Sequence, residues 1–300
     1  LMRPRVTSSR PAIGRISPVL MIFKETNAFE KDSGGGGGIL TALVLIPLVI
    51  FGIFYLSSFY FSAITAFIML LAAWEWSRLS DWNDWQKRFL YVAVQAILLG
   101  LAFPYLTQAW IIELGLGFWL LMTLYLVWAR SQPRLPMISS AVSAGLGWLI
   151  ITWCWLALQK LQLTPFYLMF MLLIIWLADT AAYVSGRLWG KHLLAPILSP
   201  KKTWEGFIFG LVFTFFIAML IVYFFKGIKP SLWQIWLLVL LTSLAAMVGD
   251  LFESQLKRLR GLKDSGQLLP GHGGVLDRMD SLLAAAPVFS GSLLLLGLAT

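Results

Sequence analysis

Apolar residues in this chain gather into long runs that are separated by short polar segments. A helix needs about 20 mainly apolar residues to cross the hydrocarbon core of a membrane. From Ile39 onwards the hydropathy pattern contains nine runs near this length, some of them joined by short turns. The pattern predicts an all-α, polytopic membrane helical bundle with about nine transmembrane helices, at roughly residues 39–56, 58–74, 89–106, 109–129, 139–159, 165–185, 206–225, 231–250 and 281–299.

The composition supports a membrane protein. Hydrophobic residues make up 59% of the chain and charged residues 12%, with a mean hydropathy of +0.81, whereas a soluble domain carries about 25% charged residues. We therefore attribute the formal charge of +9 to topology and anionic lipid headgroups, and not to nucleic-acid binding. The single cysteine, Cys154, excludes an intrachain disulfide and a cysteine-rich metal site.

The distribution of Lys and Arg predicts the orientation. With nine spans and a cytoplasmic N-terminus, 20 of the 23 Lys and Arg residues fall inside and 3 outside. Without residues 1–38 the division is still 14 to 3. Because short cytoplasmic loops carry an excess of Lys and Arg, we expect the N-terminus and the charged loop at 250–281 to face the cytoplasm.

The first 38 residues differ from the rest of the chain. They are basic, contain Pro4, Pro11 and Pro18, and end in the five-glycine run Gly34–Gly38. Glycine runs behave as flexible linkers. We expect a disordered or artefactual tail over 1–38 and an integral-membrane domain over 39–300.

The densest group of charges lies between the last two apolar runs, from Gly249 to Ser281. It holds five acidic and five basic residues, with acids near both ends and most of the bases in the middle. Carboxylates can hold a divalent cation, and basic side chains can bind the phosphates that the cation neutralises. This order predicts a metal-assisted site for phosphorylated substrates at the membrane surface.

Asp277 and Asp280 stand three residues apart before the last span. On a helix this spacing would place both carboxylates on one face, where they could share a cation; acids that complement a helix dipole are the simpler reading. Gly273 and Gly274 precede them, and glycines let backbone N–H groups approach an anion closely. The neighbouring His272 could be a turn residue, a donor to phosphate or an acid/base.

Two further acids lie within or beside apolar runs. Asp250 ends the eighth run and could point back toward Asp277. Asp179 is deep in an apolar run, where a lone acid is a functional candidate by default. A structural hydrogen bond to a neighbouring helix is the alternative for Asp179.

A second basic loop precedes the span at 206–225. It contains Ser199, Lys201, Lys202 and Thr203, which form a candidate phosphate cradle at a helix N-terminus. The glycine spacing is not that of a Walker A motif. Basic residues beside a membrane span can also do no more than fix the orientation of the span.

The charged stretch resembles a family signature. Over 27 residues it reads Ser254-x-Leu256-Lys257-Arg258, then Lys263-Asp264-x-Gly266, then Pro270-x-His272-Gly273-Gly274-x-x-Asp277-Arg278-x-Asp280. This pattern resembles the signature of bacterial phosphatidate cytidylyltransferases, also called CDP-diacylglycerol synthases. The stretches 72–76, 177–191 and 199–207 are similar to bacterial members as well, so the resemblance covers roughly residue 39 to the end.

The resemblance implies that CTP and phosphatidate give CDP-diacylglycerol and pyrophosphate at the cytoplasmic face of a bacterial inner membrane, with membrane lipids as partners and a homodimer as a candidate assembly. It implies Mg2+ as cofactor, with K+ as a candidate second ion. The implied metal ligands are Asp250 and Asp277, then Asp280 and Asp179. The implied catalytic residues are Asp250, Lys257, Arg258, Lys263, His272, Asp277 and Arg278. The implied substrate-binding residues are Ser199, Lys201, Lys202, Thr203, Ser254, Gly273 and Gly274.

Two other functions remain open from the residues. A CTP-dependent polyprenol or dolichol kinase would transfer the γ-phosphate and release CDP. A transporter or channel for an anionic lipid or ion would spread intramembrane charges over several spans, whereas here only Asp179 is deep and the other acids gather in one loop.

Overall fold

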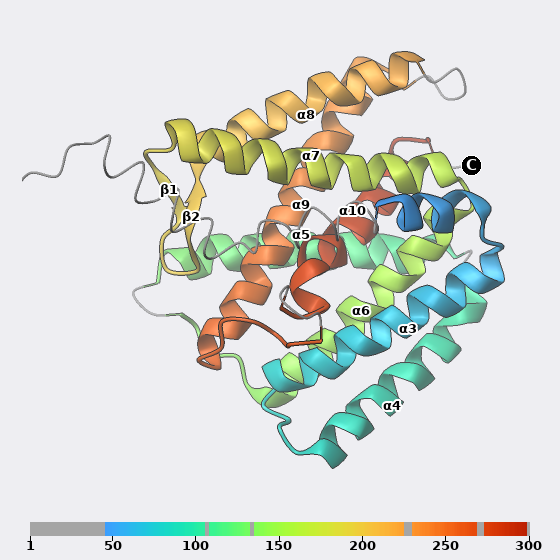
Figure 1. Cartoon of the computed structure of the whole chain (residues 1–300), viewed down its shortest axis with the longest axis vertical. Helices are drawn as coiled ribbons and strands as arrows, with labels where there is room; N and C mark the ends of the chain where they lie inside the picture. The colour runs from blue at the N-terminus through green and yellow to red at the C-terminus, as the bar shows by residue number, and fades with distance from the viewer. Residues whose placement is uncertain (1–45, 106–107, 133–134, 225–229, 269–272, 299–300) are drawn as a thin grey trace, which may run out of the picture. The chain divides into compact units, whose positions relative to one another are not determined.

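The computed structural model describes residues 46–105, 108–132, 135–224, 230–268 and 273–298. Within these ranges every predicted apolar run contains a helix, beginning with the short helix Ile46–Tyr55. The others are α3 (Ser58–Leu79), α4 (Trp85–Ala102), α5 (Ala109–Arg130), α6 (Ser140–Gln162), α7 (Pro165–Trp189), α8 (Trp204–Phe224), α9 (Leu232–Leu259) and α10 (Asp280–Leu295) (Figure 1). The predicted tail over 1–38 lies outside the described residues.

Several helices begin at a side chain that satisfies free backbone N–H groups. The Asp84 carboxylate accepts from the N–H of Gln86 before α4, and the Ser139 hydroxyl accepts from the N–H of Val142 before α6. Ser231 and Gln234 form a capping box at the start of α9. These polar residues stop the apolar runs from merging into longer helices, because each cap fixes where a helix starts.

Seven helices in the described part of the chain are long and apolar enough to cross a membrane. The two shorter ones are Ile46–Tyr55 and α10, which has 16 residues. All residues from Leu283 to Leu293 are buried, and α10 packs against α5, α6, α7 and α9 near the centre of the bundle (Figure 1). The all-α polytopic bundle is therefore confirmed, with a last helix that is enclosed by protein.

Helix α9 extends well past its predicted end at residue 250. It runs for 28 residues to Leu259 and carries Asp250, Ser254 and Lys257 with it. Ser254 follows Asp250 by four residues and Lys257 follows Ser254 by three, so the three side chains lie on one face of the helix. Part of the charged stretch is therefore a rigid helix that continues a membrane span.

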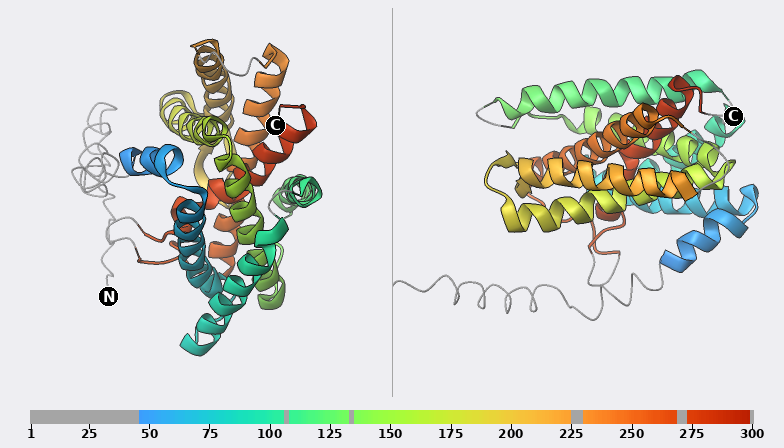
Figure 2. Two further views of the ribbon diagram at one scale, coloured as in Figure 1. Left: turned by 90° about the vertical axis from the view of Figure 1, so that its right-hand side faces the viewer. Right: turned by 90° about the horizontal axis from the view of Figure 1, so that it is seen from above.

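Helices α7 and α8 lie side by side in close contact (Figure 2). A Cβ atom added at Gly206 would lie 2.6 Å from the carbonyl oxygen of Ala182, and one at Gly210 would lie 2.8 Å from that of Ala178. Small residues let membrane helices approach backbone to backbone. Glycine at these two positions is what permits the contact.

The segment that joins α7 to α8 is a small antiparallel hairpin, where the sequence predicted a basic loop. Strand β1 (Leu193–Ala195) pairs with strand β2 (Ser199–Thr203), with Leu193 opposite Thr203 and Ala195 opposite Ser199. The candidate phosphate cradle is therefore a short strand and not a free loop.

The polar segments between helices gather at two ends of the bundle. At one end the Arg260 guanidinium donates to the carbonyl oxygens of Leu79 and Ile138 at 2.9 and 3.2 Å, and Arg130 lies over the ring of Trp204. At the other end Tyr167 donates to the carbonyl of Leu298 at 2.8 Å. The segments after α3, α5, α7 and α9 thus share one end, as the charge count predicts.

Candidate active site

The predicted acids and lysines meet where β2, α9 and the segment before α10 come together. The Lys202 ammonium on β2 lies 2.5 Å from the Asp250 carboxylate on α9. The hydroxyl of Ser254, one turn further along α9, donates to the other Asp250 oxygen at 3.2 Å. Three residues that the sequence analysis selected independently therefore form one contact group.

A second lysine–aspartate pair lies one further turn along α9. The Lys257 ammonium donates to Asp277 at 2.7 Å and forms an ion pair with Glu253 at 3.3 Å. The side chains of Lys257 and Asp277 are only 11% and 13% exposed. Ion pairs gain strength when little water reaches them, but each partner then depends on the other for neutralisation.

The Asp277 carboxylate also accepts hydrogen bonds from the chain around it. One of its oxygens accepts from the N–H of Ser265, the hydroxyl of Ser265 and the N–H of Gly274, each at 2.9 Å. Burial raises the pKa of Asp277, but the bonds from Lys257, Gly274 and Ser265 outweigh it and the net pKa lies below its ordinary value. Asp277 is therefore held as an anion.

The local structure around Asp277 differs from the predicted helical pair. Asp277 lies in a short 3₁₀ turn, Leu276–Arg278, and Asp280 is the first residue of α10. The two acids thus belong to different elements, so the shared face of one α-helix was a wrong description. Gly273, with φ of +81°, and Gly274 form the turn that brings a backbone N–H to Asp277.

Asp179 and Asp280 belong to the same charged group. Lys202 and Asp250 both act electrostatically on each of them. The backbone of α9 touches the start of α10 at Gly249, where an added Cβ would overlap the carbonyl oxygen of Asp280. All four predicted metal ligands therefore lie in one region, although no three His, Cys, Asp or Glu side chains of the described ranges are placed to hold one ion.

The remaining predicted residues have other positions. The Thr203 hydroxyl accepts from the N–H of Gly206 at 3.2 Å and so caps the start of α8. Ser199 lies opposite Ala195 in the hairpin. His272 lies outside the described residues. The other predicted basic residues are exposed at the same end of the bundle, namely Lys201, Arg258, Lys263 and Arg278.

A carboxylate outside the predicted cradle anchors the hairpin. The Glu205 side chain accepts from the backbone N–H groups of Lys191 and His192 at 3.1 and 3.2 Å, and it pairs with the His192 ring at 2.5 Å. These contacts tie the start of β1 to the start of α8. Lys202 is therefore carried on a strand whose end at Thr203 is fixed.

Three polar residues of this region are not among the predicted site residues, although Glu253 is one of the five acids of the charged stretch. Glu75 on α3 is 1% exposed and accepts from the N–H of Leu276 at 2.8 Å. Ser265 contacts Asp277, as described above, and Glu253 pairs with Lys257. Glu75 could have been found, because a lone acid in an apolar run is the same signal that selected Asp179.

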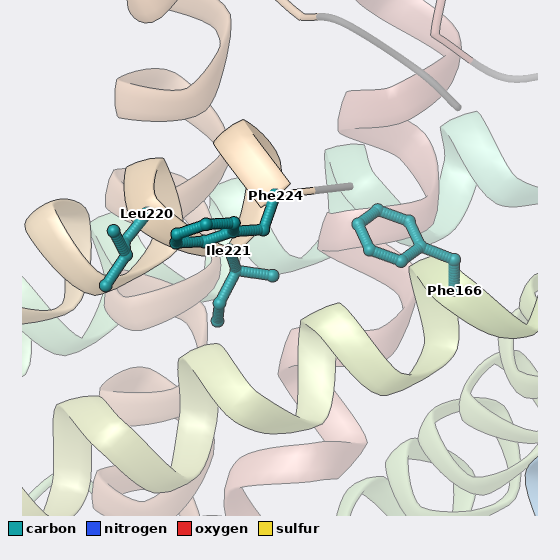
Figure 3. A pocket seen from close by; sticks show the side chains of 4 residues that line it. All are labelled: Phe166, Leu220, Ile221 and Phe224. Carbon is teal, nitrogen blue, oxygen red and sulfur yellow. The ribbon is translucent and has the colours of Figure 1, made fainter. Parts of the chain in front are cut away.

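An apolar pocket lies far from these charges, between the start of α7 and the end of α8. Its lining consists of Phe166, Leu220, Ile221 and Phe224 (Figure 3). No polar group among these four side chains could orient a phosphate. This pocket therefore offers no group that could bind a phosphate, unlike the charged end of the bundle.

Comparison with known proteins identifies the family of the chain. The model of the cytidylyltransferase family matches residues 38–296. The chain is 37% identical over 265 residues to the phosphatidate cytidylyltransferase of Pseudomonas aeruginosa, covering 84% of this chain and 94% of that protein. It is 33% identical over 283 residues to the phosphatidate cytidylyltransferase of Haemophilus influenzae, covering 84% of this chain and 96% of that protein. The chain belongs to the cytidylyltransferase family.

Proposed function

We propose that this protein transfers CMP from CTP to phosphatidate, giving CDP-diacylglycerol and pyrophosphate for phospholipid biosynthesis. The observation that carries the proposal is the meeting of two lysine–aspartate pairs, Lys202–Asp250 and Lys257–Asp277, at one end of a membrane bundle. Relatives with this activity in their names match the chain over most of its length.

The reaction needs charge neutralisation more than proton transfer. A phosphate oxygen of phosphatidate forms a bond to the α-phosphorus of CTP, and the bond from that phosphorus to the bridging oxygen breaks. Pyrophosphate leaves with the electron pair of that bond. The nucleophile is already an oxyanion, so positioning and electrostatic stabilisation supply most of the catalysis.

The lysines are placed to bind the two anionic substrates. Lys202 lies on a fixed strand beside Ser199 and Lys201, and we assign these residues to the phosphates of CTP. Lys257 lies deeper and, together with the exposed Arg258, Lys263 and Arg278, is assigned to the lipid phosphate or the triphosphate. Ammonium and guanidinium groups form strong, short hydrogen bonds with phosphate oxygens.

The carboxylates fit Mg2+ by their chemistry. Mg2+ prefers oxygen ligands and is usually held by one or two carboxylates together with substrate phosphates. Asp250 and Asp277 are the first ligands in this assignment, and Asp280 and Asp179 complete the group or support it. The ion would neutralise charge on the transferred and leaving phosphates. A second ion such as K+ belongs to the same proposal.

An assay of products tests the reaction. Purified protein in detergent, given phosphatidate, labelled CTP and Mg2+, is expected to form CDP-lipid and pyrophosphate in equal amounts. EDTA is expected to stop both, because the substrate phosphates then lose the cation that neutralises them. Formation of CDP and a phosphorylated lipid from a polyprenol would instead establish the kinase, and no nucleotide turnover with either lipid would favour transport.

Asp277→Asn is expected to lower kcat by at least about 100-fold, since loss of groups that only support a metal ligand already costs about 10- to 100-fold. The substitution removes the negative charge that faces Lys257. Asp81→Asn is the matched control, because Asp81 is exposed and its positive φ suits asparagine. Near-normal turnover by Asp277→Asn, measured as CDP-lipid formed, would remove Asp277 from the site.

Lys202→Ala is expected to raise the KM for CTP by about 10- to 100-fold, because a hydrogen bond to a charged group contributes about 1.5–3 kcal/mol. The KM for phosphatidate should change less. Lys87→Ala, which removes an exposed lysine from the same end of the bundle, provides the control. An unchanged dependence of the rate on CTP contradicts the assignment of Lys202.

The charged end is assigned to the cytoplasmic face of a bacterial inner membrane. Cys154 is fully buried, so the protein has little background reactivity toward a membrane-impermeant maleimide. In spheroplasts we expect labelling of Leu163→Cys, which lies between α6 and α7, and protection of Asn83→Cys, which lies between α3 and α4. The reverse pattern would show that the site faces outward.

A further inference from the structure

The buried carboxylate of Glu75 is not explained by any role assigned so far. Glu75 lies one turn before the end of α3, is 1% exposed and has the buried neighbours Ala72 and Trp76. Among the described residues no Lys or Arg forms an ion pair with it. A carboxylate in such surroundings is costly unless hydrogen bonds satisfy it.

Its hydrogen bonds come from the segment that carries Asp277. One Glu75 oxygen accepts from the backbone N–H of Leu276 at 2.8 Å and from the hydroxyl of Ser265 at 3.3 Å. These donors lie on both sides of the turn that contains Gly273 and Gly274. Leu276 is the direct neighbour of Asp277, so the bond sets the backbone position from which Asp277 projects.

Ser265 links the two carboxylates. Its hydroxyl is shared between Glu75 at 3.3 Å and Asp277 at 2.9 Å, and its backbone N–H donates to Asp277. A hydroxyl has one proton, so the shorter contact favours Asp277. The Ser265 carbonyl accepts from Arg78, which lies on α3 one turn after Glu75. Helix α3 therefore holds Ser265 from both sides.

Gly266 and Gly274 let the backbone lie directly against the carboxylate of Glu75. A Cβ atom added at Gly274 would lie 2.5 Å from Glu75, and one at Gly266 would overlap the other Glu75 oxygen. At these distances a side chain at either position would force the Glu75 carboxylate to move. The backbone that precedes Asp277 is thus packed against Glu75 at two points.

We propose that Glu75 is a positioning residue that acts through Ser265 and Leu276 to hold Asp277 in its working orientation. The inference rests on the proposed function and deepens it. Groups that orient a metal ligand affect affinity and rate although they touch neither metal nor substrate. Helix α3, which contributes no residue of the charged stretch, is by this account part of the active site.

Mn2+ binding to the purified full-length protein, followed by EPR without substrates, provides a readout that is independent of turnover. Glu75→Ala is expected to weaken Mn2+ binding by about 10- to 100-fold. Glu75→Gln keeps a carbonyl oxygen for the Leu276 N–H and should stay within a few-fold of wild type. Ser265→Ala should resemble Glu75→Ala, and the double variant should be little worse than either, since both act through one chain of contacts.

Gln159→Leu is the matched control. Gln159 is a buried polar residue of α6 that bonds to Ser62 and Thr65 of α3, several turns before Glu75. Its removal loosens α3 without touching Ser265 or Leu276, so Mn2+ affinity should be unchanged. An equal loss in Gln159→Leu and Glu75→Ala would reduce Glu75 to a general structural role and overturn the proposal.

Two further outcomes decide the matter. Wild-type Mn2+ affinity in Glu75→Ala, with CDP-lipid formed normally by the wild-type enzyme, would refute the inference and leave the proposed function intact. Failure of the wild-type enzyme to form CDP-lipid would refute the proposed function instead. If Glu75→Ala does not fold, Ser265→Ala alone decides, and wild-type Mn2+ affinity in that variant overturns the proposal.

Discussion

A charge that leaves bulk water has to be met by an opposite charge or by hydrogen bonds, and the architecture at one end of this bundle follows from that requirement. Lys257 and Asp277 satisfy each other at 2.7 Å with little exposure. Removing either partner would leave the other charge partly buried without its counter-charge, which is costly. Lys257 and Asp277 are 20 residues apart in the chain. Helix α9, the 3₁₀ turn of Asp277 and the glycines before that turn bring them into contact.

Helices of unequal length make this contact possible. Helix α9 continues beyond the apolar run and presents Asp250 and Lys257 two turns apart, whereas α10 is short, buried and begins beside Gly249. The segment between them therefore folds back over the end of α9. Lys202 is contributed by strand β2, which is fixed by Glu205 at its end beside α8. Substrates would thus meet a site assembled from three parts of the chain.

Hydropathy was sufficient to predict the bundle, because long apolar runs have few alternatives to helices in a membrane. The charged residues that meet at one end of the bundle were selected by the charge pattern and the family resemblance. It could not predict where helices end, since α9 continues through polar residues that tertiary contacts stabilise. The hairpin at 193–203, the 3₁₀ turn at Asp277 and the pairing of each lysine with its aspartate depend on contacts between distant segments. Glu75 could have been selected as a lone acid, but its contact with Leu276 could not be predicted, since about 200 residues separate the two.

The close contact between α7 and α8 restricts how a lipid could reach the lysines. With Gly206 and Gly210 set against the backbone of α7, no acyl chain fits between these two helices over the stretch next to the hairpin. A lipid substrate whose acyl chains remain in the bilayer therefore has to bring its headgroup to the lysines between another pair of helices. The contact between α7 and α8 beside the hairpin is therefore closed to lipid, and the lipid entry path lies between other helices of the bundle.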